Sequence, residues 1–211
     1  MISASVKVWL PISTVCPTLK SSQYSVIACG SSGSRAMLAW AGMDESVLRG
    51  MARWPGVPAV YGWLALDRRG NWLLKDPGLG RLARVGNAAL REFIGRNYAS
   101  DALGRWFFQN GPQRVYVSLA YTPLVLRLEG GSLVDHCGRP ARARSTHRDE
   151  EGSVLILVER GVGLLDDRDL MRFVEESGQA PESWPEVRRN EVAARFGFVA
   201  DPPEKAAGSL R

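Results

Sequence analysis

Four side chains in the middle of the chain are of the types that bind zinc: His136, Cys137, His147 and Asp149. A structural zinc site usually takes four ligands, arranged as two close pairs. His136 and Cys137 are neighbours, and neighbours on a strand face opposite sides, so they cannot both reach one metal from a regular strand. We therefore expect surface or loop histidines and no metal site.

Nucleophilic catalysis would need a Cys or Ser beside a base, and the chain has 2 histidines and no Gly-x-Ser-x-Gly turn. Cys137 follows His136, but sequence neighbours seldom form such a pair, which favours a core or near-core cysteine. Five carboxylates could also be an acid–base or magnesium cluster: Asp166, Asp167, Asp169, Glu175 and Glu176. Acidic residues at the start of a helix cap its free N–H groups and complement its dipole, which is the simpler explanation. We assign no catalytic residue.

The run from Gly161 to Asp166 lies between an expected strand and an expected helix, where phosphate-binding loops occur. It lacks the third glycine of a dinucleotide fingerprint and the Gly-Lys-Ser/Thr of a P-loop. A plain strand-to-helix connection is the better interpretation, and we expect no cofactor.

Basic and aromatic residues alternate over the centre of the chain, as they do on surfaces that bind single-stranded nucleic acid. The candidate contact surface consists of Arg105, Trp106, Arg114, Tyr116 and Tyr121. An RNP-type run of glycine and aromatic residues is missing. Successive strand residues face opposite ways, so at least one of the two faces belongs to the core.

The overall charge gives little support to nucleic-acid binding. The formal net charge is +5, but residues 1–42 contain Lys7, Lys20 and Arg35 and no acidic residue, which leaves +2 (5 − 3) for the rest. The excess of Arg over Lys is also what a GC-rich coding sequence would produce. No apolar run approaches the roughly eighteen residues of a membrane span. We expect a soluble protein without membrane contact.

The N-terminal part differs from the remainder. Residues 1–36 are rich in Ser and Thr, have no acidic residue and keep neither strand nor helix periodicity. Val26–Cys29 matches a lipoprotein cleavage box, but polar residues occupy the place of the apolar region that should precede it. We expect a disordered leader or a mis-assigned start, with Met1, Met37 and Met43 as alternative start residues. Cys16 and Cys29 lie in this part, so the remainder holds 1 of the 3 cysteines, which favours a reducing, cytoplasmic compartment.

From Met43 onward the pattern is that of a folded domain, expected over residues 43–199 with a disordered tail at 200–211. Asp44, Asn87 and either Asp166 or Asp167 are expected helix caps. Strands are expected at Val60–Leu66, Asn71–Lys75, Arg105–Gln109, Arg114–Ala120, Leu124–Leu128, Leu133–Cys137 and Val154–Val158. Residues 138–149 are Arg-rich and irregular, and indicate a solvated loop. The fold class is α+β, an antiparallel meander with two hairpin-then-helix units packed on it.

Two stretches of the chain resemble each other. Asp67-Arg68-Arg69-Gly70 and Asp149-Glu150-Glu151-Gly152 each precede a strand, and each is followed after about twenty residues by a capped amphipathic helix. A partial third copy begins at Asp101 and includes Gly104. The pattern indicates an internal repeat, although hairpins and amphipathic helices share these residues for general reasons.

Three runs resemble a family of uncharacterised bacterial proteins: Tyr61–Trp72, Glu92–Tyr98 and Gly104–Val117. The resemblance extends from about Met43 to Phe198 and implies no activity. A looser resemblance, in the order of elements, is to a second uncharacterised bacterial family with repeated strand–helix motifs and a suggested role in signalling.

Three function classes remain open. The first is a small cytoplasmic regulatory or interaction domain, which would contact a partner protein or a second copy of the chain through the Trp106–Tyr121 meander or the Arg139–Arg148 loop. The second is an enzyme of unrecognised type, using Asp166, Asp167 or His136. The third is a single-stranded nucleic-acid-binding module, which the low charge of the body makes the least favoured.

Overall fold

The computed structural model of the chain describes residues 43–54, 56–76, 78 and 80–203. The expected leader, the cleavage-box segment, Met1, Met37 and residues 204–211 of the expected tail lie outside the described residues. The helices are α2 (Glu45–Arg53), α3 (Ala88–Arg96), α4 (Leu170–Ser177) and α5 (Val192–Phe196), with short 3-10 turns η1 (Asp167–Asp169), η2 (Pro181–Ser183) and η3 (Arg189–Glu191). In the described part, no helix is both long enough and apolar enough to span a membrane.

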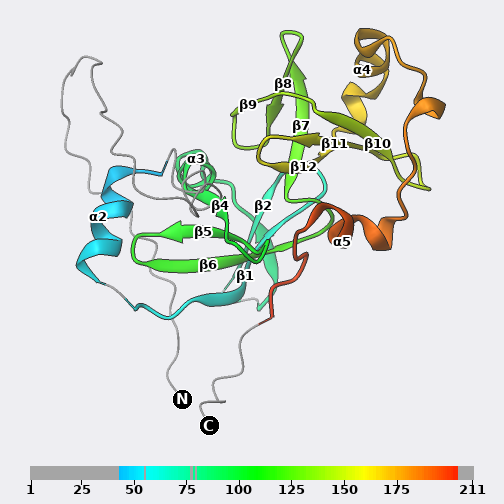
Figure 1. The fold of residues 1–211 in the computed structure, drawn as a ribbon. Coiled ribbons are helices and arrows are strands. Elements are labelled where there is room, and N and C mark those ends of the chain that lie inside the picture. Colours follow the sequence, from blue (N-terminus) through cyan, green and yellow to red (C-terminus); the bar gives the residue numbers. More distant parts are fainter. Residues whose placement is uncertain (1–42, 55, 77, 79, 204–211) are drawn as a thin grey trace, which may run out of the picture.

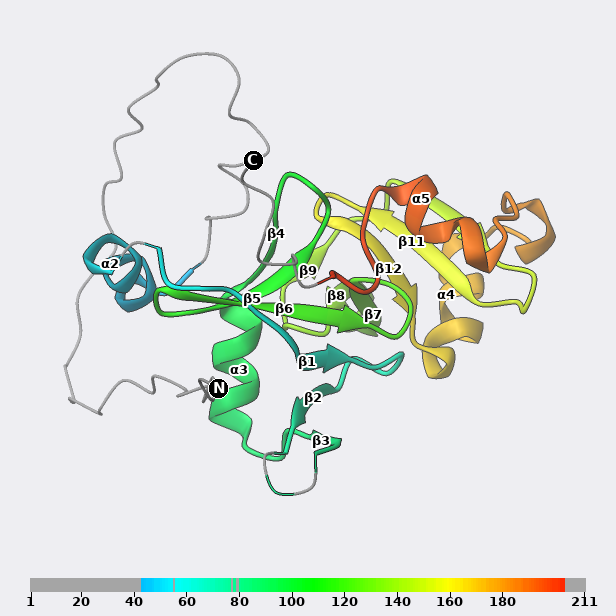
Figure 2. The same ribbon diagram turned by 90° about the horizontal axis from the view of Figure 1, so that it is seen from below.

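The strands form two six-stranded sheets, which occupy separate halves of the molecule (Figures 1 and 2). The first contains β1 (Val60–Leu66), β2 (Trp72–Lys75), β3 (Leu82–Arg84), β4 (Tyr98–Ser100), β5 (Trp106–Asn110) and β6 (Gln113–Leu119). The second contains β7 (Leu124–Glu129), β8 (Ser132–Asp135), β9 (Pro140–Ala141), β10 (Ser145–Arg148), β11 (Val154–Val158) and β12 (Gly161–Leu165). The α+β class is confirmed. The expected central meander is divided between the sheets, with β5 and β6 in the first and β7 and β8 in the second.

The two sheets have the same topology. Their strand orders are β3-β2-β1-β6-β5-β4 and, read from the other edge, β9-β8-β7-β12-β11-β10. In each half three antiparallel strands are followed by three more, and the first and sixth strands pair in parallel, β1 with β6 and β7 with β12. Helix α3 connects the two triplets of the first half, whereas residues 142–144 make that connection in the second half.

Four hairpin turns share one Asp-x-x-Gly geometry, including the three noticed in the sequence. They begin at Asp67, Asp101, Asp135 and Asp149. In each, one carboxylate oxygen accepts from the N–H groups two and four residues later, and the glycine N–H donates to the aspartate carbonyl. The glycines have φ between 75° and 81°, a region that favours Gly. The fourth copy, at Asp135, turns the chain from β8 to β9.

The expected helix caps are borne out in part. Asn87 accepts from the Leu90 N–H and caps α3 as predicted. Asp166 accepts from the Arg168 N–H at 3.1 Å, so it caps the η1 turn that leads into α4. Asp44 stands at the N-cap of α2 but makes no side-chain cap bond. Its carboxylate instead receives the Arg96 guanidinium at 3.0 Å, because the end of α3 lies beside it.

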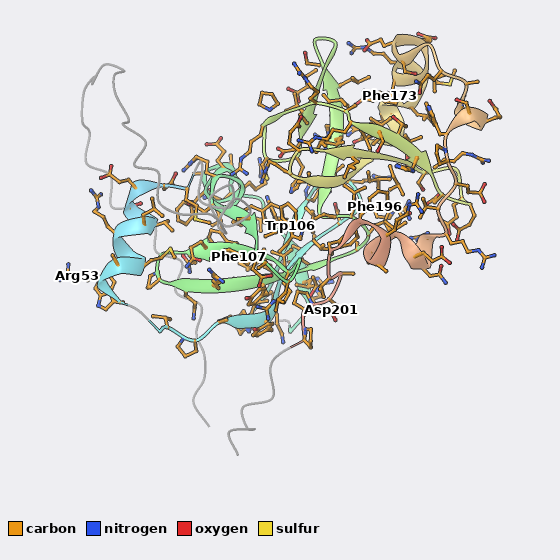
Figure 3. All side chains as sticks on the ribbon, in the orientation of Figure 1. Arg53, Trp106, Phe107, Phe173, Phe196 and Asp201 are labelled. Atoms are coloured by element: carbon orange, nitrogen blue, oxygen red, sulfur yellow. The ribbon has the colours of Figure 1, made fainter. Side chains whose placement is uncertain are left out.

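A continuous apolar cluster contains residues of both sheets and of the helices. Phe93 of α3 packs edge-on against Phe108 of β5, with ring centres 5.5 Å apart, which places α3 on the core face of the first sheet. Between the sheets, Tyr98 contacts both Trp72 and Trp106, at 4.9 and 4.8 Å. Figure 3 shows Trp106 on the side of the first sheet that faces the second.

Two expectations about the second half are wrong. The run from Gly161 to Leu165 is strand β12, paired with β11 and β7, rather than a strand-to-helix connection. Gly163 fits there because an added Cβ would lie 2.6 Å from the Leu126 side chain of the adjacent strand. The Arg-rich residues 138–149 contain β9 and β10, which pair with β8 and β11. Short edge strands carry charged residues, so their composition resembles that of a loop.

Candidate contact surfaces

The five residues of the candidate contact surface lie in three places. Antiparallel pairing of β5 and β6 puts Phe107 opposite Tyr116, and strand alternation places Arg105, Arg114 and Tyr116 on the outer face of the first sheet, away from α3. Trp106 points the other way into the core and is 3% exposed. Tyr121 lies after β6, at the junction of the two sheets.

The outer-face residues stack on one another. The guanidinium carbon of Arg105 lies 4.7 Å from the centre of the Tyr116 ring, and that of Arg114 lies 4.4 Å from the Phe107 ring. Tyr61 of β1 stacks on Tyr116 at 4.7 Å. The Phe107 and Tyr116 rings are 2% and 4% exposed. Bases stack on exposed rings, so these aromatic residues do not offer a nucleic-acid platform.

At the edge of this face, Asp101 accepts hydrogen bonds from two side chains of the face. The Tyr116 hydroxyl donates to Asp101 Oδ2 at 3.1 Å, and Arg105 donates to the same oxygen at 2.7 Å. Burial raises the pKa of Asp101, but the hydrogen bonds from Arg105 and from nearby N–H groups outweigh it, so that the pKa lies below its usual value. Burial raises the pKa of Tyr116. Both groups therefore keep their usual charge states at neutral pH.

Tyr121 links the two halves of the molecule. Its hydroxyl donates to Asp149 Oδ2 at 2.7 Å, and Asp149 is fully buried. The Tyr121 ring lies between the guanidiniums of Arg68 and Arg189, at 4.9 and 5.0 Å, and Glu151 forms ion pairs with both. Burial, followed by the bond to Asp149, raises the pKa of Tyr121. All these groups bond to one another, which indicates a structural role.

A first groove, here called the α2 groove, lies where α2 meets the β5–β6 turn. It has a volume of about 240 Å³. Its lining consists of Met51, Trp54, Gly56, Val57, Ala59, Gln109, Pro112 and Arg114. Trp54 is 42% exposed, and the guanidinium of Arg53, at the outer end of α2 in Figure 3, lies 4.9 Å from its ring centre. Arg114 belongs to both this groove and the outer face, so the two are continuous.

A second and larger groove, here called the seam groove, lies beside α4 in the second half and has a volume of about 530 Å³. Its apolar floor includes Leu128, Leu133, Ala141 and Phe173. Its rim includes Ser132, Arg142, Ala143, Arg144, Ser145, Thr146, Glu176, Ser177 and Gln179. Residues 142–146, from the segment expected to be a solvated loop, thus line this groove.

A family model described as "Protein of unknown function (DUF2946)" matches residues 43–203. The chain belongs to this family. The match confirms the resemblance to proteins of unknown function that the sequence indicated. No curated protein matches the chain.

Two solved structures are similar to this family member. One is a DUF1285 family protein from Shewanella baltica, 18% identical, with a TM-score of 0.40 over 54% of this chain and 91% of its own. The other is a DUF1285 family protein from Silicibacter pomeroyi, 15% identical, with a TM-score of 0.44 over 69% of this chain and 85% of its own.

Two of the catalytic candidates come together, because Cys137 Sγ lies 3.6 Å from His136 Nε2. The expectation that these sequence neighbours do not form a pair is therefore wrong. His136 lies between Trp72 and Tyr98, where burial and the charges of nearby arginines lower its pKa to about 3. Burial raises the pKa of the adjacent Cys137 thiol to about 12, so neither group is suited to nucleophilic chemistry. Hydrogen bonds from Arg168 lower the pKa of Asp166 to about 2. No cluster of three or more metal-binding side chains occurs among the described residues.

The structure contains a serine–histidine pair that the sequence pattern did not indicate. Ser145 Oγ and His147 Nε2 lie 3.1 Å apart on β10, and Ser145 lines the seam groove. Within the described part of the chain, His147 Nδ1 has no hydrogen-bond partner, so no carboxylate orients the ring as in a catalytic triad. Strand alternation alone brings residues two apart together.

Sequence reasoning did not identify Trp54 or Arg53 as surface residues. The sequence Trp54-Pro55-Gly56 did signal the end of a helix, because Pro and Gly there stop it. No further helical turn follows to cover the last side chains of the helix, which favours their exposure. The floor of the seam groove had no such signal, since Phe173 follows Leu133 by 40 residues (173 − 133).

Proposed function

We propose that residues 43–199 form a small cytoplasmic regulatory or protein-interaction domain, which binds a segment of a partner protein in the α2 groove. The observation that carries the proposal is the exposed Trp54 in an apolar groove, with Arg114 in its lining and the Arg53 guanidinium over the Trp54 ring. Neither arginine forms an ion pair with a carboxylate in the described part of the chain.

The residue types support a protein partner. Trp, Tyr and Arg are the side chains over-represented at the energetic centres of protein interfaces. Trp54 gives a large, partly exposed ring, and Leu48 of the same helix is 38% exposed. A charged surface arginine with no carboxylate beside it leaves a favourable place for an acidic group of the partner.

The groove also defines the chemistry of the partner segment. A volume of about 240 Å³ suits one or two large apolar side chains, which would pack between Trp54 and Pro112. Carboxylates flanking that anchor would reach Arg53 and Arg114. On the neighbouring outer face, Arg105 and Tyr116 extend the surface, with Arg105 keeping 18% side-chain exposure.

The test uses the full chain and a displayed library of peptides of random sequence. We expect selection of peptides that combine an aromatic or large aliphatic residue with nearby Asp or Glu. Their affinity should fall at least about tenfold in Trp54→Ala and in the double variant Arg53→Gln with Arg114→Gln, which corresponds to about 1.4 kcal/mol.

Met171→Ala is the matched control, because Met171 is an exposed apolar residue on α4, far from this groove, with 72% exposure. Binding should be unchanged in this variant. Selected peptides that bind all the variants equally, or a library that yields no peptide above background, would overturn the proposal. Analytical ultracentrifugation of the same variants tests a second copy of the chain as the partner.

A further inference from the structure

The second sheet is curled, and the curl opens a seam. Its edge strands, β9 and β10, stand at opposite ends of the strand order yet are joined by residues 142–144. In a flat sheet five spacings would separate them by about 24 Å. The connection from Ala141, the last residue of β9, to Ser145, the first of β10, is four Cα–Cα steps long and spans at most about 15 Å. The sheet must therefore bend until its edges approach, as in a barrel that is open along one side.

Helix α4 lies beside this seam and supplies its apolar wall. The carboxylate of Asp169, just before α4, accepts from the Leu128 N–H at 3.0 Å and fixes the helix to β7. Phe173 then faces the groove together with Leu128 and Leu133, each 8% exposed. The Trp184 ring packs against that of Phe173, with ring centres 6.0 Å apart. Figure 3 shows Phe173 next to the second sheet, on the side of α4.

The rim of the seam groove carries a surplus of positive charge. Arg142 and Arg144 are exposed on the connection between β9 and β10. Glu159 accepts from the Arg142 backbone N–H, and its carboxylate lies 3.9 Å from Arg144. Glu176 is the acidic residue among those that line the groove, and Arg172 holds its carboxylate at 2.8 Å. Among the residues that the structure describes, the Arg142 guanidinium forms no ion pair within 4.0 Å, although its charge, like that of Arg144, acts on the Glu159 carboxylate.

We propose that the seam groove binds a small organic anion with an apolar body, such as an acyl or aryl carboxylate. The body would pack on Leu133 and Phe173, and the anionic head would bind Arg142 and Arg144. The volume of about 530 Å³ lies within the range of small-molecule sites, roughly 300 to 1,000 Å³. This site is separate from the α2 groove, and either proposal can fail without the other.

The test compares two fluorescent probes of similar size on the full chain. Anilinonaphthalene sulfonate carries a negative charge, and N-phenylnaphthylamine is neutral. We expect both to bind, the anionic probe with one-to-one stoichiometry, and dodecanoate to displace it. Replacing Arg142 and Arg144 by Gln should weaken the anionic probe at least about tenfold, and the neutral probe less than about twofold.

The matched control replaces Arg81 and Arg84 by Gln, because both are exposed and lie in the first half of the molecule, away from both grooves. This change removes the same charge and should leave both affinities unchanged. Near-ultraviolet circular dichroism checks that each variant keeps its native packing. Absence of saturable binding, equal weakening in the control, or failure of dodecanoate to displace the probe would overturn the proposal.

Discussion

Replacing Tyr121 by Phe tests whether one buried hydrogen bond holds the two halves together. The substitution removes the phenol oxygen and keeps the ring between Arg68 and Arg189. Asp149 is fully buried, and its Oδ1 is occupied by the N–H groups of its own turn. Within the described residues, Oδ2 accepts its hydrogen bond from the Tyr121 hydroxyl, at 2.7 Å. The variant therefore leaves a buried, charged oxygen without a partner.

A hydrogen bond to a charged group contributes about 1.5–3 kcal/mol, and the buried oxygen left behind cannot be hydrated without opening the junction. We expect Tyr121→Phe to lower the free energy of unfolding by about 2 kcal/mol. For a domain of this size, that corresponds to a decrease in Tm of about 4–8 °C. Urea denaturation at pH 7, followed by far-ultraviolet circular dichroism, measures the change.

The chain offers a matched control in the equivalent turn of the first half. The Tyr116 hydroxyl donates to Asp101 Oδ2, but that oxygen also binds Arg105 at 2.7 Å. Tyr116→Phe leaves a satisfied carboxylate and should cost about 0.5–1 kcal/mol. Equal losses in the two variants, or a loss below about 0.5 kcal/mol for Tyr121→Phe, would refute the assigned role of the Tyr121–Asp149 bond.

Three further predictions follow from the geometry. The pKa of Asp166 is lowered from 3.8 to about 2, so its ionised form stabilises the fold by about 2 kcal/mol above pH 4, and this is lost as the pH falls toward 2. The difference in unfolding free energy between the natural chain and Asp166→Asn should shrink accordingly. Gly104→Ala should cost more than about 3 kcal/mol, since its Cβ would lie 2.3 Å from the Gly197 carbonyl oxygen. Gly152→Ala should cost about 1 kcal/mol, the conformational cost alone, because nothing lies within 4 Å. The Cys137 thiol, with a pKa of about 12, should react with a disulfide reagent at pH 8 at least about a hundredfold more slowly when folded than in urea.

Each of these three predictions would be contradicted by a specific measured outcome. A stability difference for Asp166→Asn that stays constant between pH 2 and pH 6 would show that the carboxylate has the same affinity for protons in both states. Equal costs at Gly104 and Gly152 would show that the contact with Gly197 yields easily. Mass spectrometry of the Cys137 peptide measures its reaction separately from the other cysteines, and equal rates with and without urea would mean that the thiol is accessible.

Much of the local structure could be predicted from the sequence. Val60–Leu66 and Val154–Val158 are strands with the expected bounds, because each is a run of apolar and aromatic residues between turn residues. Asn87 caps a helix and Gly178 ends one in the left-handed conformation. Such signals act within a few residues of the chain, so they can be recognised without knowledge of the tertiary fold.

The candidate site was predicted less well. Arg105, Arg114 and Tyr116 do share a face, as alternation along paired strands requires. Trp106 and Tyr121 were grouped with them by composition. In the structure Trp106 lies in the core and Tyr121 at the junction of the two sheets, so neither shares the outer face. Composition cannot distinguish an aromatic ring that packs against a second sheet from one that faces outward, because both are apolar residues on a strand.

The sequence by itself determined three of the four Asp-x-x-Gly turns, the caps at Asn87 and Asp166, most of the strands and the α+β class, since these depend on backbone preferences and local hydrogen bonds. Only the tertiary structure decided that the strands form two sheets of the same topology. The pairings of β1 with β6 and of β7 with β12 join residues that are 53 to 55 and 39 positions apart, respectively (115 − 60, 117 − 64, 163 − 124). Such contacts depend on which apolar faces can be buried together, and no short segment of the chain contains that information. The two grooves arise from the same long-range packing.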